Sequence, residues 1–316
     1  MVIAVPTYCR PELLGRLLPQ LVTQADSLDP PAGILVVDND PAGSAWTVCD
    51  AHRGRVDYVH EIGPGISRAR NRALLAASDY DLLVFLDDDE TPTPGWLTVM
   101  VDRWRQWRCA AVAGPVVAQF PVPPDEWLIA SRAFDTWQLT NGALILGAAT
   151  NNLLLDLVQV RAAGLRFDER FGLTGGEDTM FTRTLTAGGG VIRWCVDAVV
   201  EDPIATGRMN RRWVLLRTFR AGSTWTRVVV RLSDGRIAQW RTRFGIIARA
   251  SVRLASGSTS WIAGSVHDDV GRRARGAVAV ASGAGMLTGI VGYVYAEYRR
   301  PTIAAVPILP TLPPHE

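Results

Sequence analysis

Four short runs of apolar residues near the start of the chain, each followed by a stretch with helical spacing, constrain the fold most. The runs are Val2–Val5, Ile34–Val37, Val56–Val59 and Leu82–Leu86. Uninterrupted apolar runs of this length are typical of parallel strands that are buried on both faces, and a helix after each strand provides the crossover. We therefore predict an α/β domain in which helices flank a mostly parallel sheet.

The balance of charge changes sign along the chain and divides it into two regions. Residues 1–202 carry 16 arginines and 26 acidic residues, whereas residues 203–316 carry 17 arginines and 5 acidic residues. A basic region favours an anionic partner such as a phospholipid leaflet, a diphosphate-linked lipid or nucleic acid. We predict an α/β domain over residues 1–205, a helical, arginine-rich region over residues 206–300, and a proline-rich, disordered tail over residues 301–316.

Two segments of the basic region raise the question of membrane contact. Residues 277–296 carry no charge and are long enough to cross a bilayer, but they are mainly Gly, Ala, Ser and Val, so an interfacial helix or a packed hairpin is favoured over a span.

Residues 236–249 read as a helix with one apolar face that has arginines around it. The apolar residues are Ile237, Trp240, Phe244 and Ile247, and the arginines are Arg236, Arg241, Arg243 and Arg249. This pattern suits a helix at a membrane surface, and it equally suits an amphipathic helix that covers the α/β domain.

The start of the chain and its cysteines indicate the compartment. The first residues read as a strand, without the basic segment and apolar core of a signal peptide. The four cysteines show no metal-binding spacing, which favours reduced thiols. We expect a cytoplasmic protein, at the inner face of the cell membrane if the basic region binds lipid.

Polar residues follow the predicted strands at the edge where an α/β sheet binds its ligands. The most acidic group is Asp87-Asp88-Asp89, which follows the strand Leu82–Leu86. Adjacent carboxylates repel one another, and Mg²⁺ or Mn²⁺ stabilises such a cluster while sharing its coordination shell with substrate phosphates. The plain alternative is a solvated acidic loop.

Five motifs resemble those of family 2 glycosyltransferases of the GT-A fold, in the order and at the spacings of that family. They are Ala4–Pro11, Val36–Asn39, Ala69–Asn71, Phe85–Asp89 and Gly175–Asp178. The resemblance covers about residues 1–205. It implies a GT-A, Rossmann-like catalytic domain, with a nucleotide-binding half over about residues 1–110 and an acceptor half over about residues 111–205.

The same resemblance implies an activity and assigns roles to residues. One sugar would pass from a nucleotide-diphosphate sugar, a UDP-sugar by default, to an acceptor hydroxyl with inversion. The nucleotide would contact Pro6, Thr7, Tyr8, Arg10, Asp38, Asn39, Arg70, Asp87 and Asp88. Asp89 would bind the metal, Mn²⁺ or Mg²⁺, with Glu201 in place of a histidine that many relatives carry.

The motif Gly175–Asp178 supplies the expected catalytic residues. Asp178, beside Glu177, would be the general base that takes the proton of the acceptor hydroxyl. The structural alternative is that Asp178 only caps the helix that follows. Contacts to the donor or acceptor sugar are expected from Asn152, Gly175, Gly176 and Trp213, and Asn151 is a further candidate.

Departures from the family pattern bear on the nucleotide contacts and on the expected function. Asn39 stands where many relatives have an acid, which affects only the expected contacts with the base. Met209–Trp213 keeps the Arg-Trp of the processive Gln-x-x-Arg-Trp motif without its Gln, and the sequence shows no array of transmembrane segments. We therefore expect transfer of a single sugar to a saccharide or lipid-linked acceptor, in the assembly of a cell-surface polysaccharide or glycolipid. No nucleic-acid partner is expected, because the arginines alternate with apolar residues and form no known module.

Two other functions compete with this interpretation. A catalytically inactive, membrane-associated subunit of the same fold is the first, and the presence of Asp89 and Asp178 argues against it. A sugar nucleotidyltransferase is the second. It would need a glycine-rich loop after the first strand, whereas the chain has Pro6-Thr7-Tyr8-Cys9 there and contains no lysine.

Overall fold

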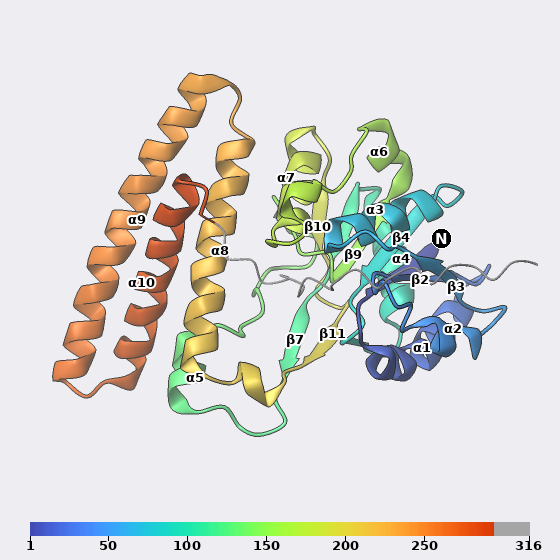
Figure 1. Ribbon diagram of the computed structural model, residues 1–316, viewed down its shortest axis with the longest axis horizontal. Coiled ribbons are helices and arrows are strands. Elements are labelled where there is room, and N and C mark those ends of the chain that lie inside the picture. The colour runs from blue at the N-terminus through green and yellow to red at the C-terminus, as the bar shows by residue number, and fades with distance from the viewer. Residues whose placement is uncertain (294–316) are drawn as a thin grey trace, which may run out of the picture.

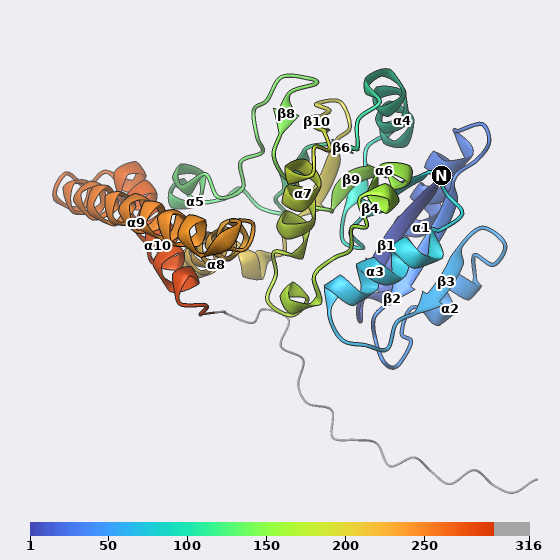
Figure 2. The ribbon, with the colours of Figure 1, turned by 90° about the horizontal axis from the view of Figure 1, so that it is seen from above.

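The computed structural model describes residues 1–293 and shows two regions side by side, an α/β region and a module of three long helices (Figure 1). Seen from above, the helical module stands to one side of the sheet (Figure 2). The expected tail over residues 301–316 and the end of segment 277–296 lie outside the described residues.

An eight-stranded sheet with the order β3-β2-β1-β4-β9-β6-β10-β8 forms the centre of the α/β region. Its first four strands are parallel: β3 (Asp57–His60), β2 (Gly33–Asp38), β1 (Val2–Thr7) and β4 (Leu82–Leu86). The others are β9 (Asn152–Asp156), antiparallel to both neighbours, β6 (Ala111–Ala113), β10 (Ile192–Trp194), parallel to β6, and the antiparallel edge strand β8 (Leu144–Ile145). The prediction of a mostly parallel α/β sheet is confirmed.

Helices cover both faces of this sheet, because alternate residues of each strand point to opposite sides. Ile3 and Val5 of β1 belong to one buried cluster, and Val2 and Ala4 belong to another. The first face is covered by α1 (Pro11–Asp26), α2 (Trp46–Asp50) and α4 (Trp96–Trp107). The second face is covered by α3 (Ile66–Ala76), α6 (Leu157–Ala162) and α7 (Glu177–Ala187). The continuous apolar runs of the sequence are explained by this two-sided burial.

A second, three-stranded sheet joins the α/β region to the helices. It has the order β5 (Thr91–Pro92), β11 (Val200–Pro203) and β7 (Val116–Gln119). The apolar stretch over residues 111–119 forms two strands in different sheets, β6 and β7, because the chain turns at Gly114-Pro115. A Cβ at Gly114 would lie 2.1 Å from the carbonyl oxygen of Ala198, so only glycine fits this turn. The short helix α5 (Glu126–Ser131) follows β7.

Three long helices form the C-terminal module: α8 (Arg211–Arg231), α9 (Gly235–Val266) and α10 (Val270–Ile290). α10 packs along both α8 and α9, and α8 lies next to the α/β region (Figure 1). They confirm helices within the region over residues 206–300, and the second half of α9 consists largely of Gly, Ala, Ser and Thr. None of the helices within residues 1–293 is long and apolar enough to cross a membrane.

Candidate active site

A cavity of about 770 Å³ opens at the carboxyl ends of β1 and β4. The starts of α3 and α7 line it, and α8 closes it on the side of the helical module. Its volume lies within the range of about 300–1,000 Å³ that is usual for small-molecule sites. The cavity therefore stands where an α/β sheet is expected to bind its ligand.

The acidic loop after β4 is tied to the loop after β1. The Thr7 hydroxyl donates to Asp88 Oδ2 over 2.6 Å, and Arg10 Nη1 donates to Asp88 Oδ1 over 2.9 Å and to Asp89 Oδ2 over 2.8 Å. Asp88 is buried, so both of its oxygens are satisfied by protein donors. Asp89 lies at the more open edge, where Arg208 Nη2 is 3.8 Å from its Oδ2.

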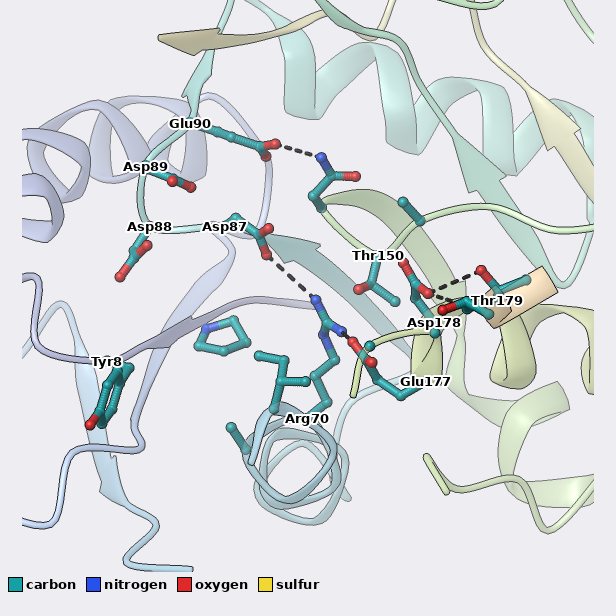
Figure 3. Close-up of a pocket in the computed structure, with 18 of the residues that line it drawn as sticks. Tyr8, Arg70, Asp87, Asp88, Asp89, Glu90, Thr150, Glu177, Asp178 and Thr179 are labelled. Carbon is teal, nitrogen blue, oxygen red and sulfur yellow. Dashed lines mark hydrogen bonds and ion pairs between the residues drawn. The ribbon is translucent and has the colours of Figure 1, made fainter. Parts of the chain in front are cut away.

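Arg70 of α3 lies between the acidic loop and the start of α7 (Figure 3). Its guanidinium forms an ion pair with Glu177 Oε1, and its Nη2 is 3.6 Å from Asp87 Oδ1. Burial raises the pKa of Glu177 to about 7 and that of Asp87 to about 6, although Arg70 opposes both shifts. One cation thus serves two carboxylates, of which Glu177 is buried, where an uncompensated charge is costly, and Asp87 is partly exposed at the cavity.

Asp178 faces the same cavity from the opposite side to Asp88 and Asp89 (Figure 3). Its Oδ1 accepts hydrogen bonds from the backbone nitrogen and the hydroxyl of Thr179. The alternative that Asp178 caps α7 is wrong, because the N-cap residue is Gly176. Gly176 has a φ of +95°, and a Cβ there would lie 2.2 Å from Thr224 Cγ2, so α7 begins in close contact with α8.

Most of the residues expected from the sequence line this cavity. They are Pro6, Thr7, Tyr8, Arg10, Asn39, Arg70, Asp87, Asp88, Asp89, Gly175, Gly176, Glu177, Asp178 and Trp213. Trp213 is also packed against protein: its ring stacks on Phe134 at 5.6 Å, and the guanidinium of Arg217 lies 5.1 Å from its centroid.

Three expected residues lie elsewhere, and their surroundings explain why. Asp38 is fully buried, and its carboxylate accepts from the backbone nitrogens of Asp40 and Ala45 and from the hydroxyl of Tyr58. Its role is to organise the loop after β2. The structure does not place it at the cavity, and a contact with the base stays a prediction.

Asn152 and Glu201 are likewise outside the cavity lining. The amide of Asn152 donates to two backbone carbonyls and accepts from the indole of Trp96, so it joins α4, β9 and the second sheet. Glu201 accepts from Gln119 Nε2. Because side chains alternate along a strand, the neighbouring Asp202 is the one that reaches the cavity.

Several lining residues were not found from the sequence: Glu90, Thr150, Asp202, Arg208 and Arg217. Glu90 directly follows the aspartate triplet, and it accepts from Asn151 Nδ2 over 2.6 Å. Burial, together with the charge of Asp87, raises the pKa of Glu90 well above its usual value. Glu90 and Asp202 could have been predicted as site residues, because they directly follow the candidates Asp89 and Glu201 in the sequence.

Three buried oxygens at the cavity have no hydrogen-bond partner among residues 1–293. They are Glu90 Oε2, Thr150 Oγ1 and Glu177 Oε2. Buried polar atoms are rarely left unsatisfied in native proteins, so these oxygens are hydrogen-bonding capacity next to the cavity that the described protein groups do not use.

The acidic edge of the cavity fits a divalent cation only in combination with a substrate. Within the described part of the chain, no three side chains are grouped as a ready metal site. However, Mg²⁺ and Mn²⁺ bound with nucleotides commonly take one or two protein carboxylates and complete their shell with phosphates and water. Burial and the charge of Asp89 raise the pKa of Asp202, so positive charge between these two carboxylates would relieve their repulsion.

Residues 2–167 match the family model described as glycosyl transferase family 2. A curated relative, the succinoglycan biosynthesis protein ExoM of Rhizobium meliloti (strain 1021), is 32% identical over 297 residues, which are 92% of each chain. This chain therefore matches the curated relative over nearly its whole length, including the helical module.

Solved structures share the fold at low identity. The structure of S. aureus TarS 1–349 in complex with UDP-GlcNAc has a TM-score of 0.53 and 14% identity, and the match covers 93% of this chain and 92% of that one. The structure of GalNAc-T7 with UDP, GalNAc and Mn²⁺ also has a TM-score of 0.53, with 12% identity over 74% of this chain and 48% of that one.

Proposed function

The chain belongs to glycosyl transferase family 2 and is a glycosyltransferase, and we propose that it moves one sugar from a nucleotide-diphosphate sugar to an acceptor hydroxyl with inversion. The observation that carries this proposal is one cavity with an acidic edge on one side and Asp178 on the other. A donor held at the acidic edge and an acceptor held near Asp178 would meet between them.

The donor binds at the loops after β1 and β4. Tyr8 and Asn39 border the nucleoside, and Asp88, fixed by Thr7 and Arg10, is set to accept from the ribose. Asp89, with Asp202 in place of the expected Glu201, would hold Mn²⁺ or Mg²⁺ against the diphosphate. When bound, the cation neutralises the charge that develops on the leaving diphosphate.

Arg70, expected from the sequence to contact the nucleotide, has a further role in this proposal. Its guanidinium is engaged by Glu177 and Asp87. It therefore positions the start of α7, and with it Asp178, relative to the acidic loop. This makes Arg70 a positioning residue that acts through Glu177.

Asp178 is the general base in this proposal. The acceptor oxygen attacks the anomeric carbon while its proton passes to the Asp178 carboxylate, and the bond from that carbon to the diphosphate oxygen breaks. A single displacement of this kind inverts the configuration and needs only one carboxylate. The hydrogen bonds from Thr179 to Oδ1 fix the orientation of that carboxylate.

The likeness to ExoM supports a place in polysaccharide biosynthesis, and the complexes of TarS with UDP-GlcNAc and of GalNAc-T7 with UDP and GalNAc support a UDP-sugar as donor. The acceptor proposed here is a saccharide or a lipid-linked saccharide.

The test is release of nucleotide from UDP-, GDP- and dTDP-sugars, with Mn²⁺ or with EDTA, in the presence of membrane extract as a source of acceptor. We expect Asp178→Asn to lower kcat by a factor of about 10²–10⁴, the usual contribution of a general base, and to leave nucleotide binding intact. Asp89→Asn should weaken metal-dependent binding of the nucleotide itself. Asp79→Asn, an exposed residue outside the cavity, is the matched control and should behave like the unaltered chain.

The outcomes separate the candidate functions. Release that needs a metal and is lost in the Asp178 variant supports the proposal and identifies the donor. Nucleotide binding without any release, unchanged in both variants, would replace it with the inactive-subunit function.

A further inference from the structure

The outward face of α9 carries large exposed apolar side chains in its first half and again near its end, with exposed alanine, serine and threonine between them. Ile237, Trp240, Phe244 and Val266 are 79%, 55%, 64% and 74% exposed, and Ile247, Val252 and Ile262 are exposed on the same side. α9 is the outermost element of the molecule, on the side away from the sheet (Figures 1 and 2). Contiguous exposed apolar surface of this kind marks an interaction site.

The inward face of the same helix is built mainly from small residues. Its buried positions are Ile246, Ala250, Gly257 and Gly264. A Cβ at Gly257 would lie 2.9 Å from the carbonyl oxygen of Gly276, so α9 and α10 are in backbone contact there. Apart from Ile246 and Leu254, which face the other helices, the large apolar side chains of α9 point away from the protein. The expectation of an amphipathic helix that covers the α/β domain is wrong, because its apolar face covers nothing within residues 1–293.

The charges of α9 select the partner. The helix carries five arginines and no acidic residue: Arg236, Arg241, Arg243, Arg249 and Arg253. Arg249 lies over the ring of Trp225 in α8, and Arg253 donates to the hydroxyl of Ser282 in α10. The arginines beside the outer face are therefore Arg236, Arg241 and Arg243. Guanidinium groups pair with phosphate oxygens in a fork geometry, and arginines beside an apolar face are typical of helices at anionic membrane surfaces. Trp240 adds an aromatic ring that favours the interface between lipid and water.

We propose that the outer face of α9, defined by Ile237, Trp240, Phe244, Ile247, Val252, Ile262 and Val266, docks on an anionic phospholipid surface. The apolar side chains enter the boundary between headgroups and acyl chains, and the flanking arginines bind headgroup phosphates. The helix lies in the plane of the membrane along its length of about 48 Å. This inference is independent of the proposed reaction, because it uses no residue of the cavity.

Flotation of the full chain with vesicles tests the proposal. We expect it to float with vesicles of phosphatidylcholine mixed with phosphatidylglycerol, and much less with phosphatidylcholine alone. Trp240→Ser combined with Phe244→Ser should weaken binding about tenfold or more, because two exposed rings no longer enter the lipid. Arg236→Gln and Arg241→Gln should weaken binding to the anionic vesicles by about fivefold each, and high salt should have a similar effect.

Ile62→Ser combined with Leu75→Ser is the matched control, since both residues are exposed apolar side chains of the α/β region. This control should float like the unaltered chain. Because the substituted side chains are exposed, circular dichroism and thermal unfolding should be unchanged in every variant, so loss of flotation cannot come from misfolding. Equal flotation of the Trp240/Phe244 variant, or a concentration-dependent dimer that this variant abolishes without any vesicle binding, would overturn the proposal.

Discussion

The α/β region and the helical module place their large apolar side chains in opposite ways. In the α/β region, Phe85, Trp96 and Phe181 are among the largest side chains with almost no exposure. In the helical module, Trp240 and Phe244 face outward, and glycines occupy the contacts between helices. A Cβ at Gly285 of α10 would lie 1.9 Å from the carbonyl oxygen of Phe219 in α8.

This contrast separates two sources of stability. Removal of apolar surface from water dominates the α/β region, where about 25 cal/mol is gained for each Å² buried. The helical module depends more on close backbone approach and dispersion, as helices do in a lipid environment. Substitutions that would be severe in one region should therefore be mild in the other.

The largest expected difference comes from truncating a phenylalanine in each region. Phe85→Ala should lower the free energy of unfolding by about 3–5 kcal/mol, because Phe85 is 1% exposed and its removal leaves a cavity against Phe167. Phe244→Ala should change it by about 0.5 kcal/mol or less. Urea unfolding followed by circular dichroism measures both, and equal losses would refute the contrast.

The second difference concerns pH, because buried carboxylates are concentrated in the α/β region. Burial raises the pKa of Glu177 from 4.5 to about 7. Its protonated form therefore favours the folded state, and this contribution is complete below about pH 4.5 and is lost as the pH rises through 7. The free energy of unfolding should therefore fall between about pH 4.5 and 7, and Glu177→Gln should make this fall smaller by about 1–3 kcal/mol.

Thermal unfolding at a series of pH values measures that decline. Arg241→Gln in α9 is the control, and its stability should follow the same pH profile as the unaltered chain. A Glu177→Gln profile parallel to that of the unaltered chain would show that the pKa of Glu177 is the same in the folded and unfolded states.

The smallest difference comes from adding a methyl group within the helical module. Gly285→Ala should cost about 1–2 kcal/mol, because α8 and α10 must move apart. Gly245→Ala of α9 has nothing within 4 Å of its new Cβ and should stabilise the chain by about 0.5–1 kcal/mol through helix propensity. Thermal unfolding of both variants checks this, and a stabilising Gly285→Ala would show that the module packs loosely.

Much of the α/β region could be predicted from the sequence, because two-sided burial leaves a continuous apolar run in each parallel strand. β1, β2 and β4 are clear examples. The helical module was predicted less well. The sequence predicted helices over residues 206–300 but did not show where α9 ends, since Gly257 and Gly264 contact α10 without giving an apolar period. The apolar face of a helix is normally taken as its buried face, whereas the apolar face of α9, which includes Trp240, is exposed.

The site could be predicted as far as the family motifs reached. They located the acidic loop and Asp178 at one cavity. They could not indicate that Arg70 is engaged by two carboxylates, since Glu177 is 107 residues away along the chain. They also could not show that Asp202, and not Glu201, lines the cavity, because this depends on which face of β11 is turned toward the cavity.

The position of α8 has a mechanical consequence. The 21-residue helix α8 contributes Trp213, Arg217 and Thr224 to the cavity lining. It also packs against α10 through Gly222 and Ser223. The width of the cavity is therefore set by the angle between the two regions of the molecule as well as by individual rotamers. A change at the α8–α10 seam that never touches a substrate will alter how tightly that substrate is held.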